Sequence, residues 1–205
     1  MKPARIAIML PRFSRYGGVE RFGYNLAEAL AKRGHLVDFI CNRQDAEPPF
    51  GVTIRKVRRL GPFKILKVIS FAVLAEKERR HGKYDCSIGL GKTLHQDIMR
   101  VGGGPAKKYR QCMENAHTGL QRLRLKLRHL LYPHHILDHW LETKRYHQAD
   151  VRIVAVSHMM RDYVRECFGL ENIDVIYNKP DLKRFYPPSP EERDRARNEY
   201  AIAPE

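Results

Sequence analysis

Two glycines between a predicted strand and a predicted helix are the first residues with a chemical use. Residues 5–10 form an apolar run, a loop with Gly17 and Gly18 follows, and apolar residues then recur at helical spacing. Glycines let a backbone approach a ligand closely, and the free N–H groups of a helix N-terminus attract phosphate. A tight turn that needs a positive φ explains the same glycines, and the spacing is not the Gly-x-Gly-x-x-Gly of a nicotinamide site.

Two further glycine clusters follow predicted strands. Residues 89–93 (Gly-Leu-Gly-Lys-Thr) look like the end of a P-loop, but Cys86 stands where its first glycine belongs, so we reject a nucleoside triphosphatase site. Residues 102–104 are three glycines at the end of the predicted strand 98–101. They either form a hinge or bring the backbone against a ligand, and both interpretations stand.

Histidines and cysteines do not indicate a metal centre. His134, His135 and His139 lie close to Asp138, but no set of ligands at zinc spacing completes them. The four cysteines are widely spaced and include no Cys-x-x-Cys pair. This usage favours free thiols in a reducing compartment, and we predict no metal and no cofactor.

Strand and helix signals alternate along the chain. The predicted strands are residues 5–10, 36–41, 52–57, 84–90, 98–101, 151–156 and 173–177, and the predicted helices are 19–32, 63–80 and 157–168. Ser157 is the expected N-cap of the last of these helices. The alternation predicts an α/β fold with a doubly wound parallel sheet, which binds ligands at the carboxyl ends of its strands.

The charge of the chain points to an anionic partner. The 205 residues include 38 Lys and Arg against 23 Asp and Glu, a formal net charge of +15, and 43% hydrophobic residues are enough to fill a core. A nucleic acid, a phosphorylated substrate or an acidic membrane surface would fit this charge, and so would a basic protein that is merely soluble. The longest apolar stretch, residues 63–75, contains two lysines, so we predict no membrane-spanning helix.

A basic helical segment at residues 105–148 interrupts the alternation. Leucines recur in it at helical spacing, among the cations Arg122, Arg124, Lys126 and Arg128. Such a segment can lie on an anionic bilayer, with the leucines in the interface and the cations at the headgroups. It can equally be a helix with a core-facing stripe and a solvated basic face, which the residues alone favour.

Several segments, taken in order, resemble glycosyltransferase family 4. Residues 16–21 (Tyr-Gly-Gly-Val-Glu-Arg) and 25–37 resemble the family's Gly-Gly-x-Glu-Arg loop and the helix after it. Residues 155–169 and 175–187 resemble its later Val-Ser helix and its Val-Ile-x-Asn-Gly-Val-Asp signature, with Lys179 in place of the glycine. Residues 96–104, the basic segment and residues 141–146 are similar to bacterial glucosyltransferases of the lipopolysaccharide core.

The resemblance implies a GT-B architecture, in which two Rossmann-like domains face a cleft. Residues 1–188 would be the N-terminal, acceptor-side domain, with the basic segment at about 105–148 as its insert. Residues 189–205 would begin the linker to a C-terminal donor domain that this chain lacks. Sugar transfer would retain anomeric configuration without a metal, and we expect the fragment alone to be inactive.

The resemblance also suggests partners: a nucleotide sugar, a glycolipid acceptor and an anionic membrane surface, with no nucleic acid. Gly17 and Gly18 would face the donor's phosphates. Other candidate substrate contacts are Arg12, Arg15, Arg100, Gly102 and Gly103, and the expected membrane contacts are Arg122, Arg124, Lys126 and Arg128. The protein would be cytoplasmic, at the inner face of the bacterial inner membrane.

No catalytic residue carries over from the family. Gly103 stands where related enzymes often carry an acid, and Ala106 stands near the position of a histidine in some of them. Asp97 is the remaining candidate. The alternative function is a basic Rossmann-like module that binds a membrane or nucleic acid without catalysis, and a small dinucleotide-binding regulator is a further rival.

Overall fold

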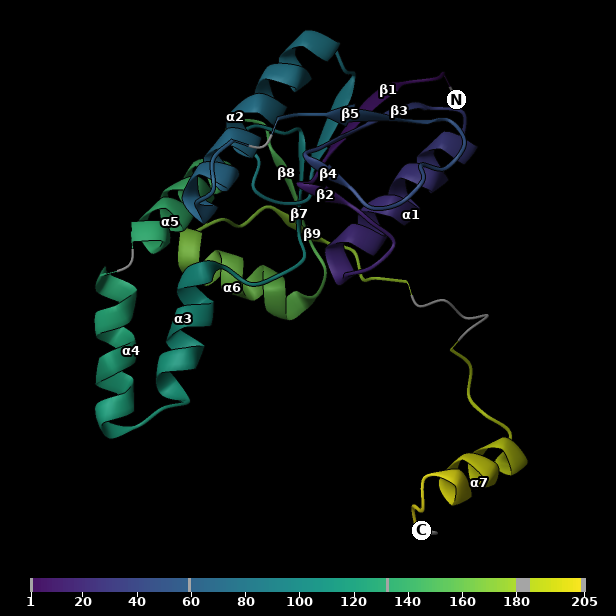
Figure 1. Cartoon of the computed structure of the whole chain (residues 1–205), viewed down its shortest axis with the longest axis vertical. Coiled ribbons are helices and arrows are strands. Elements are labelled where there is room, and N and C mark those ends of the chain that lie inside the picture. Colours follow the sequence, from purple (N-terminus) through teal and green to yellow (C-terminus); the bar gives the residue numbers. More distant parts are fainter. Residues whose placement is uncertain (1, 59, 132, 180–184, 204–205) are drawn as a thin grey trace.

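A seven-stranded parallel sheet forms the centre of the molecule (Figure 1). The computed structural model describes the backbone of residues 2–58, 60–131, 133–179 and 185–203, and all their side chains except those of residues 64, 129–131 and 133–139. The strand order is β5-β3-β1-β6-β7-β8-β9. Their bounds are β1 (Arg5–Met9), β3 (Leu36–Cys41), β5 (Val52–Lys56), β6 (Cys86–Gly89), β7 (Ile98–Val101), β8 (Arg152–Ala155) and β9 (Ile173–Val175).

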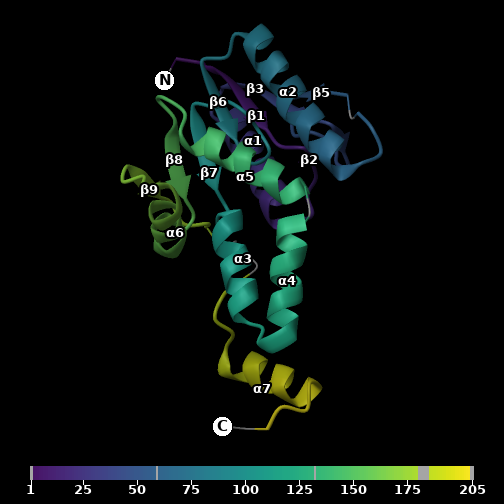
Figure 2. The same cartoon turned by 90° about the vertical axis from the view of Figure 1, so that its left-hand side faces the viewer.

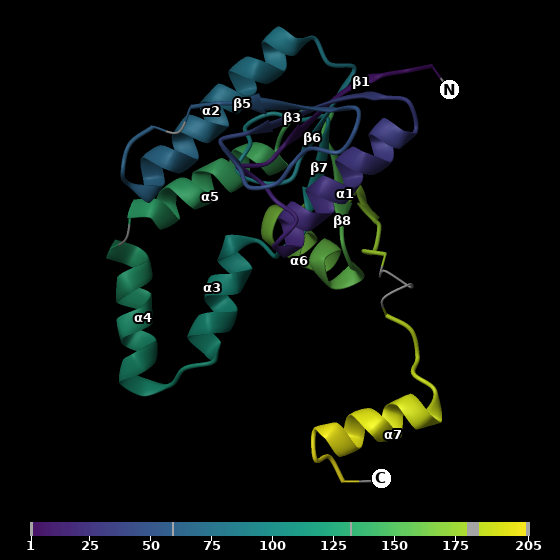
Figure 3. The same ribbon diagram turned by 45° about the vertical axis from the view of Figure 1, so that its right-hand side comes forward.

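The sheet is doubly wound, as predicted, because its alternating side chains bury two faces. On one face Ile8 and Phe39 pack with residues of α1 (Gly18–Lys32). On the other face Met9 and Ile40 pack with residues of α2 (Lys64–Gly82). The two helices lie on opposite sides of the sheet in Figure 3. Each predicted strand and helix outside the basic segment is confirmed to within two residues.

The strands β7, β8 and β9 pack against two other helices, α5 (Pro133–Tyr146) and α6 (His158–Phe168). The rings of Tyr146 and Phe168 stack with their centroids 4.1 Å apart, which joins the ends of the two helices. The predicted cap is confirmed, since the Ser157 hydroxyl accepts the N–H of Met160 at 3.2 Å. This helix therefore begins directly after the carboxyl end of β8.

The basic segment folds as three helices, α3 (Ala106–Asn115), α4 (Gly119–Leu131) and α5. The first two form a hairpin that projects from the sheet (Figures 1 and 2). On α4, Leu120, Leu123 and Leu127 are 63%, 54% and 49% exposed. The core-facing interpretation is therefore wrong for these three leucines, and the side chains of residues 130 and 131 lie outside the described residues.

Two features of the fold were not predicted. The two-residue strands β2 (Arg12–Phe13) and β4 (Arg43–Gln44) pair in parallel as a small separate ribbon. Near the end of the chain, α7 (Pro190–Glu199) begins with a capping box between Ser189 and Glu192. The expected division of the chain at residue 188 is not tested by this helix and stays a prediction.

A buried carboxylate joins the strands around β1. Asp38 of β3 is 6% exposed, and its Oδ2 atom accepts hydrogen bonds from Arg5 Nη2 and the Tyr84 hydroxyl, both at 2.9 Å. Arg55 of β5 lies 3.4 Å from the same oxygen through its Nε. Burial, and then the bond to Asp38, raise the pKa of the Tyr84 hydroxyl above its ordinary value. One side chain thus ties β1, β3, β5 and the residues before β6 together.

Replacing this carboxylate should destabilise the fold. We expect Asp38→Asn to lower the free energy of unfolding by roughly 2 kcal/mol, because two arginines lose their anion but both still reach water. Urea unfolding followed by circular dichroism measures the change. Glu28→Gln is the control, since Glu28 pairs with Lys32 on the surface of α1. Equal losses in the two variants would contradict the role of Asp38.

Candidate functional site

The carboxyl ends of the strands meet the N-terminus of α1 at one edge of the sheet. Gly17 is the N-cap of this helix with φ at 97°, a conformation that other residues rarely adopt, so the turn itself requires glycine. A Cβ atom at Gly17 would collide with the carboxylate of Glu20, which folds back over the first turn. The helix end attracts this carboxylate, and a phosphate at Gly17 and Gly18 would meet Glu20 first.

Arg100 is the central cation of this edge. It is the third residue of β7 and only 8% exposed. Its guanidinium carbon lies 3.7 Å from the ring centroid of Phe22 on α1, and its Nη2 donates to Asn178 Oδ1 at 2.8 Å. Burial lowers the pKa of Arg100. No ion pair of this arginine is found among the described residues, so its positive charge is not neutralised by a neighbouring carboxylate there.

The two glycines proposed beside Arg100 differ in their surroundings. A Cβ atom at Gly102 would lie 2.5 Å from Arg100 Nη1, so Gly102 leaves the space that the guanidinium fills. A Cβ atom at Gly103 would meet nothing within 4 Å. The structure therefore gives Gly102 a role in placing Arg100, and leaves open space beside the Cα atom of Gly103.

Arg12 and Arg15 are engaged elsewhere. Arg12 Nε lies 2.5 Å from Asp45, whose other oxygen accepts from Arg43, and these two cations lower the pKa of the Asp45 carboxyl. Arg15 donates to the Tyr24 hydroxyl at 2.6 Å and lies over the ring of that tyrosine. Neither arginine joins the group around Arg100 in this structure.

Asp97 lies away from this edge. It precedes β7, four residues or about 13 Å along the chain from Val101 at the carboxyl end of the strand. Its Oδ2 accepts both the backbone N–H and the hydroxyl of Ser87 at 2.6 Å. These bonds give Asp97 a structural task in joining β6 to β7, and we do not retain it as a candidate catalytic acid.

A cavity of about 420 Å³ opens beside the glycine loop. Gly103, Gly104, α3, α5 and α6 enclose it, and Met160 and Tyr163 contribute apolar and aromatic surface. Its charged groups are paired, since Glu142 accepts the N–H of Ala106 at 3.1 Å and Lys108 binds Glu166. The cavity therefore suits an uncharged part of a ligand.

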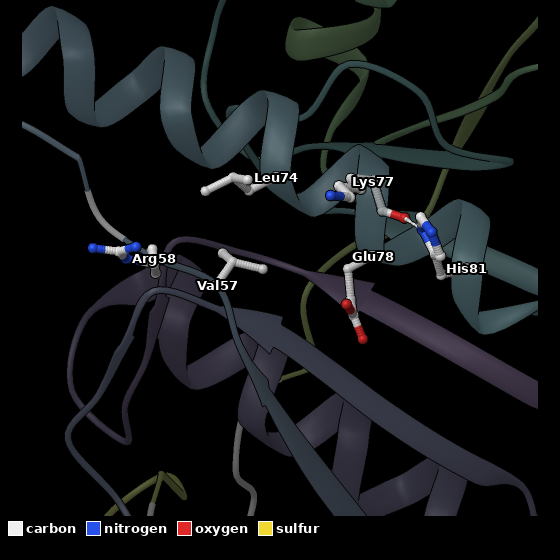
Figure 4. Close-up of a pocket in the computed structure, with 6 residues that line it drawn as sticks. All are labelled: Val57, Arg58, Leu74, Lys77, Glu78 and His81. Atoms are coloured by element: carbon white, nitrogen blue, oxygen red, sulfur yellow. Dashed lines mark hydrogen bonds between the residues drawn. The ribbon is translucent and has the colours of Figure 1, made fainter.

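A second hollow, of about 360 Å³, lies far from these residues, between α2 and the chain after β5 (Figure 4). Val57 and Leu74 face each other across it, and His81 is hydrogen-bonded to the carbonyl of Lys77 at 2.7 Å. No described group of three His, Cys, Asp or Glu side chains is close enough to hold a metal ion.

Sequence reasoning missed three members of the site. Phe22, Asn178 and Glu20 lie within motifs that the sequence singled out, but no spacing rule connects them to Arg100 or Gly17. Asn178 is 78 residues from Arg100, and only the folded sheet brings them together. Part of the signature that contains Asn178, residues 180–184, lies outside the described residues.

Comparisons with known proteins agree with this architecture. The model of glycosyltransferase family 4 matches residues 16–184. WaaG, a glycosyltransferase involved in lipopolysaccharide biosynthesis, is 14% identical, with a TM-score of 0.75 over 97% of this chain and 52% of its own. Sucrose-phosphate synthase from Thermosynechococcus elongatus is 16% identical, with a TM-score of 0.62 over 98% of this chain and 53% of its own. No curated protein matches the sequence.

The two solved structures are too distant in sequence to show more than the fold, and the chain spans about half the length of each. They confirm the expected α/β, Rossmann-like fold of GT-B glycosyltransferases. The family model covers most of the chain, including the Gly17 loop, Arg100 and Asn178. The chain therefore belongs to glycosyltransferase family 4.

Proposed function

We propose that this chain is the acceptor-side, N-terminal half of a retaining glycosyltransferase. It would help to move a sugar from a nucleotide sugar to a glycolipid of the lipopolysaccharide-core type or to a related polysaccharide acceptor. Membership of family 4 supports the transfer of a sugar. WaaG, whose fold is similar, is involved in lipopolysaccharide biosynthesis. This similarity supports an acceptor of the lipopolysaccharide-core type.

The proposed chemistry depends on positioning and on charge. A transfer between a held donor and a held acceptor needs the two aligned and the departing diphosphate stabilised. Arg100 would supply a buried positive charge to acceptor phosphate, and the open backbone at Gly103 would let the acceptor come close. The remaining groups would come from a donor domain, so we expect the 205-residue chain to bind its acceptor but to transfer no sugar.

The observation that carries the lipid part of the proposal is the surface of α4. At about 100° per residue, Leu120, Leu123 and Leu127 fall within a stripe about 60° wide. Arg122 and Lys126 lie along one side of this stripe, and Arg124 and Arg128 lie along the other. All seven side chains are exposed. Leucines flanked by cations on both sides are typical of helices that lie in an anionic membrane interface.

The same helix supports the proposed peripheral location. None of the helices in the described part of the chain is long and apolar enough to cross a membrane. The hairpin of α3 and α4 projects from the sheet, so it would be able to reach a surface (Figure 2). We propose that it rests on the cytoplasmic face of an anionic membrane that contains the acceptor.

Removing the cations of α4 should weaken binding to anionic vesicles. Each Lys or Arg near such a surface contributes about 1 kcal/mol. We therefore expect the variant with Arg122, Arg124, Lys126 and Arg128 changed to Ser to bind phosphatidylglycerol vesicles at least roughly a hundredfold more weakly in co-sedimentation. A control with Arg21, Lys32, Arg33 and Lys56 changed to Ser removes the same charge from other exposed positions and should lose far less. Equal losses would show that only net charge matters.

Removing the leucine stripe separates a membrane from a nucleic acid as the partner. We expect Leu120, Leu123 and Leu127 changed together to Ser to lose vesicle binding while the free energy of unfolding stays nearly constant, because these side chains are already about half exposed. DNA binding, measured by fluorescence anisotropy, should not change. Unaltered vesicle binding in this variant would contradict insertion of the stripe.

A further inference from the structure

A third hollow holds the single tryptophan of the chain. It has a volume of about 650 Å³ and lies between α5 and the loop that joins β6 to β7. Trp140, Lys144, His147 and Gln148 line it from α5 and the residues after it, and His95 lines it from the loop. Trp140 is 48% exposed, so its ring is open to a ligand.

The cavity is distinct from the site at the carboxyl edge. An α-helix turns about 100° per residue, so Trp140 and Lys144 lie on one face of α5, and His147, directly after the helix, continues this face. Glu142 lies on the opposite face. Glu142 contributes to the cavity beside Gly103. The body of α5 therefore separates the two hollows, and a ligand in one does not touch the residues of the other.

Hydrogen bonds hold the two walls of the cavity together in the absence of a ligand. Gln148 donates through Nε2 to the carbonyl of Leu94 at 2.5 Å and accepts the N–H of Gln96 through Oε1 at 3.2 Å. These two bonds hold the loop against the end of α5. The hollow is thus preformed, and a ligand would not have to order the loop first.

The lining carries one cation and two imidazoles. Lys144 Nζ lies 4.7 Å from the centroid of the Trp140 ring, and the imidazoles of His95 and His147 add two further nitrogen-bearing side chains. None of the described lining residues carries a carboxylate. Glu76 of α2 is near enough to interact with His95, but Arg79 and Arg80 already bind it. The positive charge of the cavity therefore has no compensating anion in its described lining.

We propose that this cavity binds a phosphate ester. The phosphate would lie beside Lys144 and His95, whose N–H groups would donate to its oxygens. His147 donates through Nδ1 to the carbonyl of Thr143 at 3.0 Å, so its Nε2 would donate to the phosphate only when the ring is doubly protonated. The Trp140 ring offers apolar surface to the glycerol or sugar that carries the phosphate. The ester would come either from a soluble sugar phosphate or from a lipid headgroup, since α4 and α5 lie on the same side of the molecule (Figure 2). The proposal does not depend on sugar transfer.

The fluorescence of Trp140 reports on this cavity alone, because the chain has 1 tryptophan. We would titrate the 205-residue chain with glycerol 3-phosphate and, below its micelle concentration, with dihexanoyl phosphatidylglycerol. A saturable change in emission with either probe is expected, and the probe that binds more tightly identifies the source of the ester. Sodium chloride at matched ionic strength and dihexanoyl phosphatidylcholine should have little effect.

Two lysine variants make the test specific. Lys144→Met should weaken binding of the effective probe about tenfold or more, which is the loss expected for a charge-assisted hydrogen bond. Lys107→Met removes the same charge from an exposed position on α3 outside the cavity and should leave binding unchanged. Emission that does not respond to either phosphate ester, an equal response to phosphatidylcholine, or equal losses in the two variants would overturn the proposal. Because neither vesicle sedimentation nor sugar transfer is measured, this result is independent of the proposed function.

Discussion

The buried carboxylate of Asp38 is the interaction on which the rest of the structure depends. It lies inside a parallel sheet, where an unpaired charge is costly, and is satisfied only because Arg5, Arg55 and Tyr84 converge on it from three other segments. Arg5 also donates to the carbonyl of Gly82, which ties the end of α2 to β1. These bonds support the pairing of the central strands, whose carboxyl ends lead to the Gly17 loop and the residues around Arg100.

Positively charged side chains are arranged differently in three regions of the molecule. Around β1 the arginines are matched with acids, as Asp38 and Asp45 show. At the carboxyl edge Arg100 is held by an aromatic ring and an amide, and no described carboxylate pairs with it. On α4 the cations are exposed. These cations contribute to the net charge of +15 and would be available to anionic ligands.

The sequence predicts the elements of this fold well because each depends on local patterning: apolar runs of strand length, helical spacing in α1, and the Ser157 cap. The candidate site is predicted less well because it depends on long-range partners. Nothing in the neighbouring sequence shows that Arg12 forms an ion pair with Asp45, or that Asp97 accepts a hydrogen bond from Ser87. Phe22 of α1 and Asn178, which follows β9, become partners of Arg100 only in the folded chain. The helix α7 did have a local signal, Ser189 followed by Pro190 and Glu192.

The surface of α4 is better explained by a partner than by the stability of the isolated chain. Exposed leucines contribute little to folding, and cations on both sides of them repel one another in water. An anionic interface removes both disadvantages, since the leucines leave water and the cations meet phosphates. Either contribution alone gives weak and reversible attachment, and stable anchoring requires two signals acting together. On the proposed membrane, the charges would act over about a Debye length and guide the helix to the surface, whereas the leucines would act only on contact and keep it there.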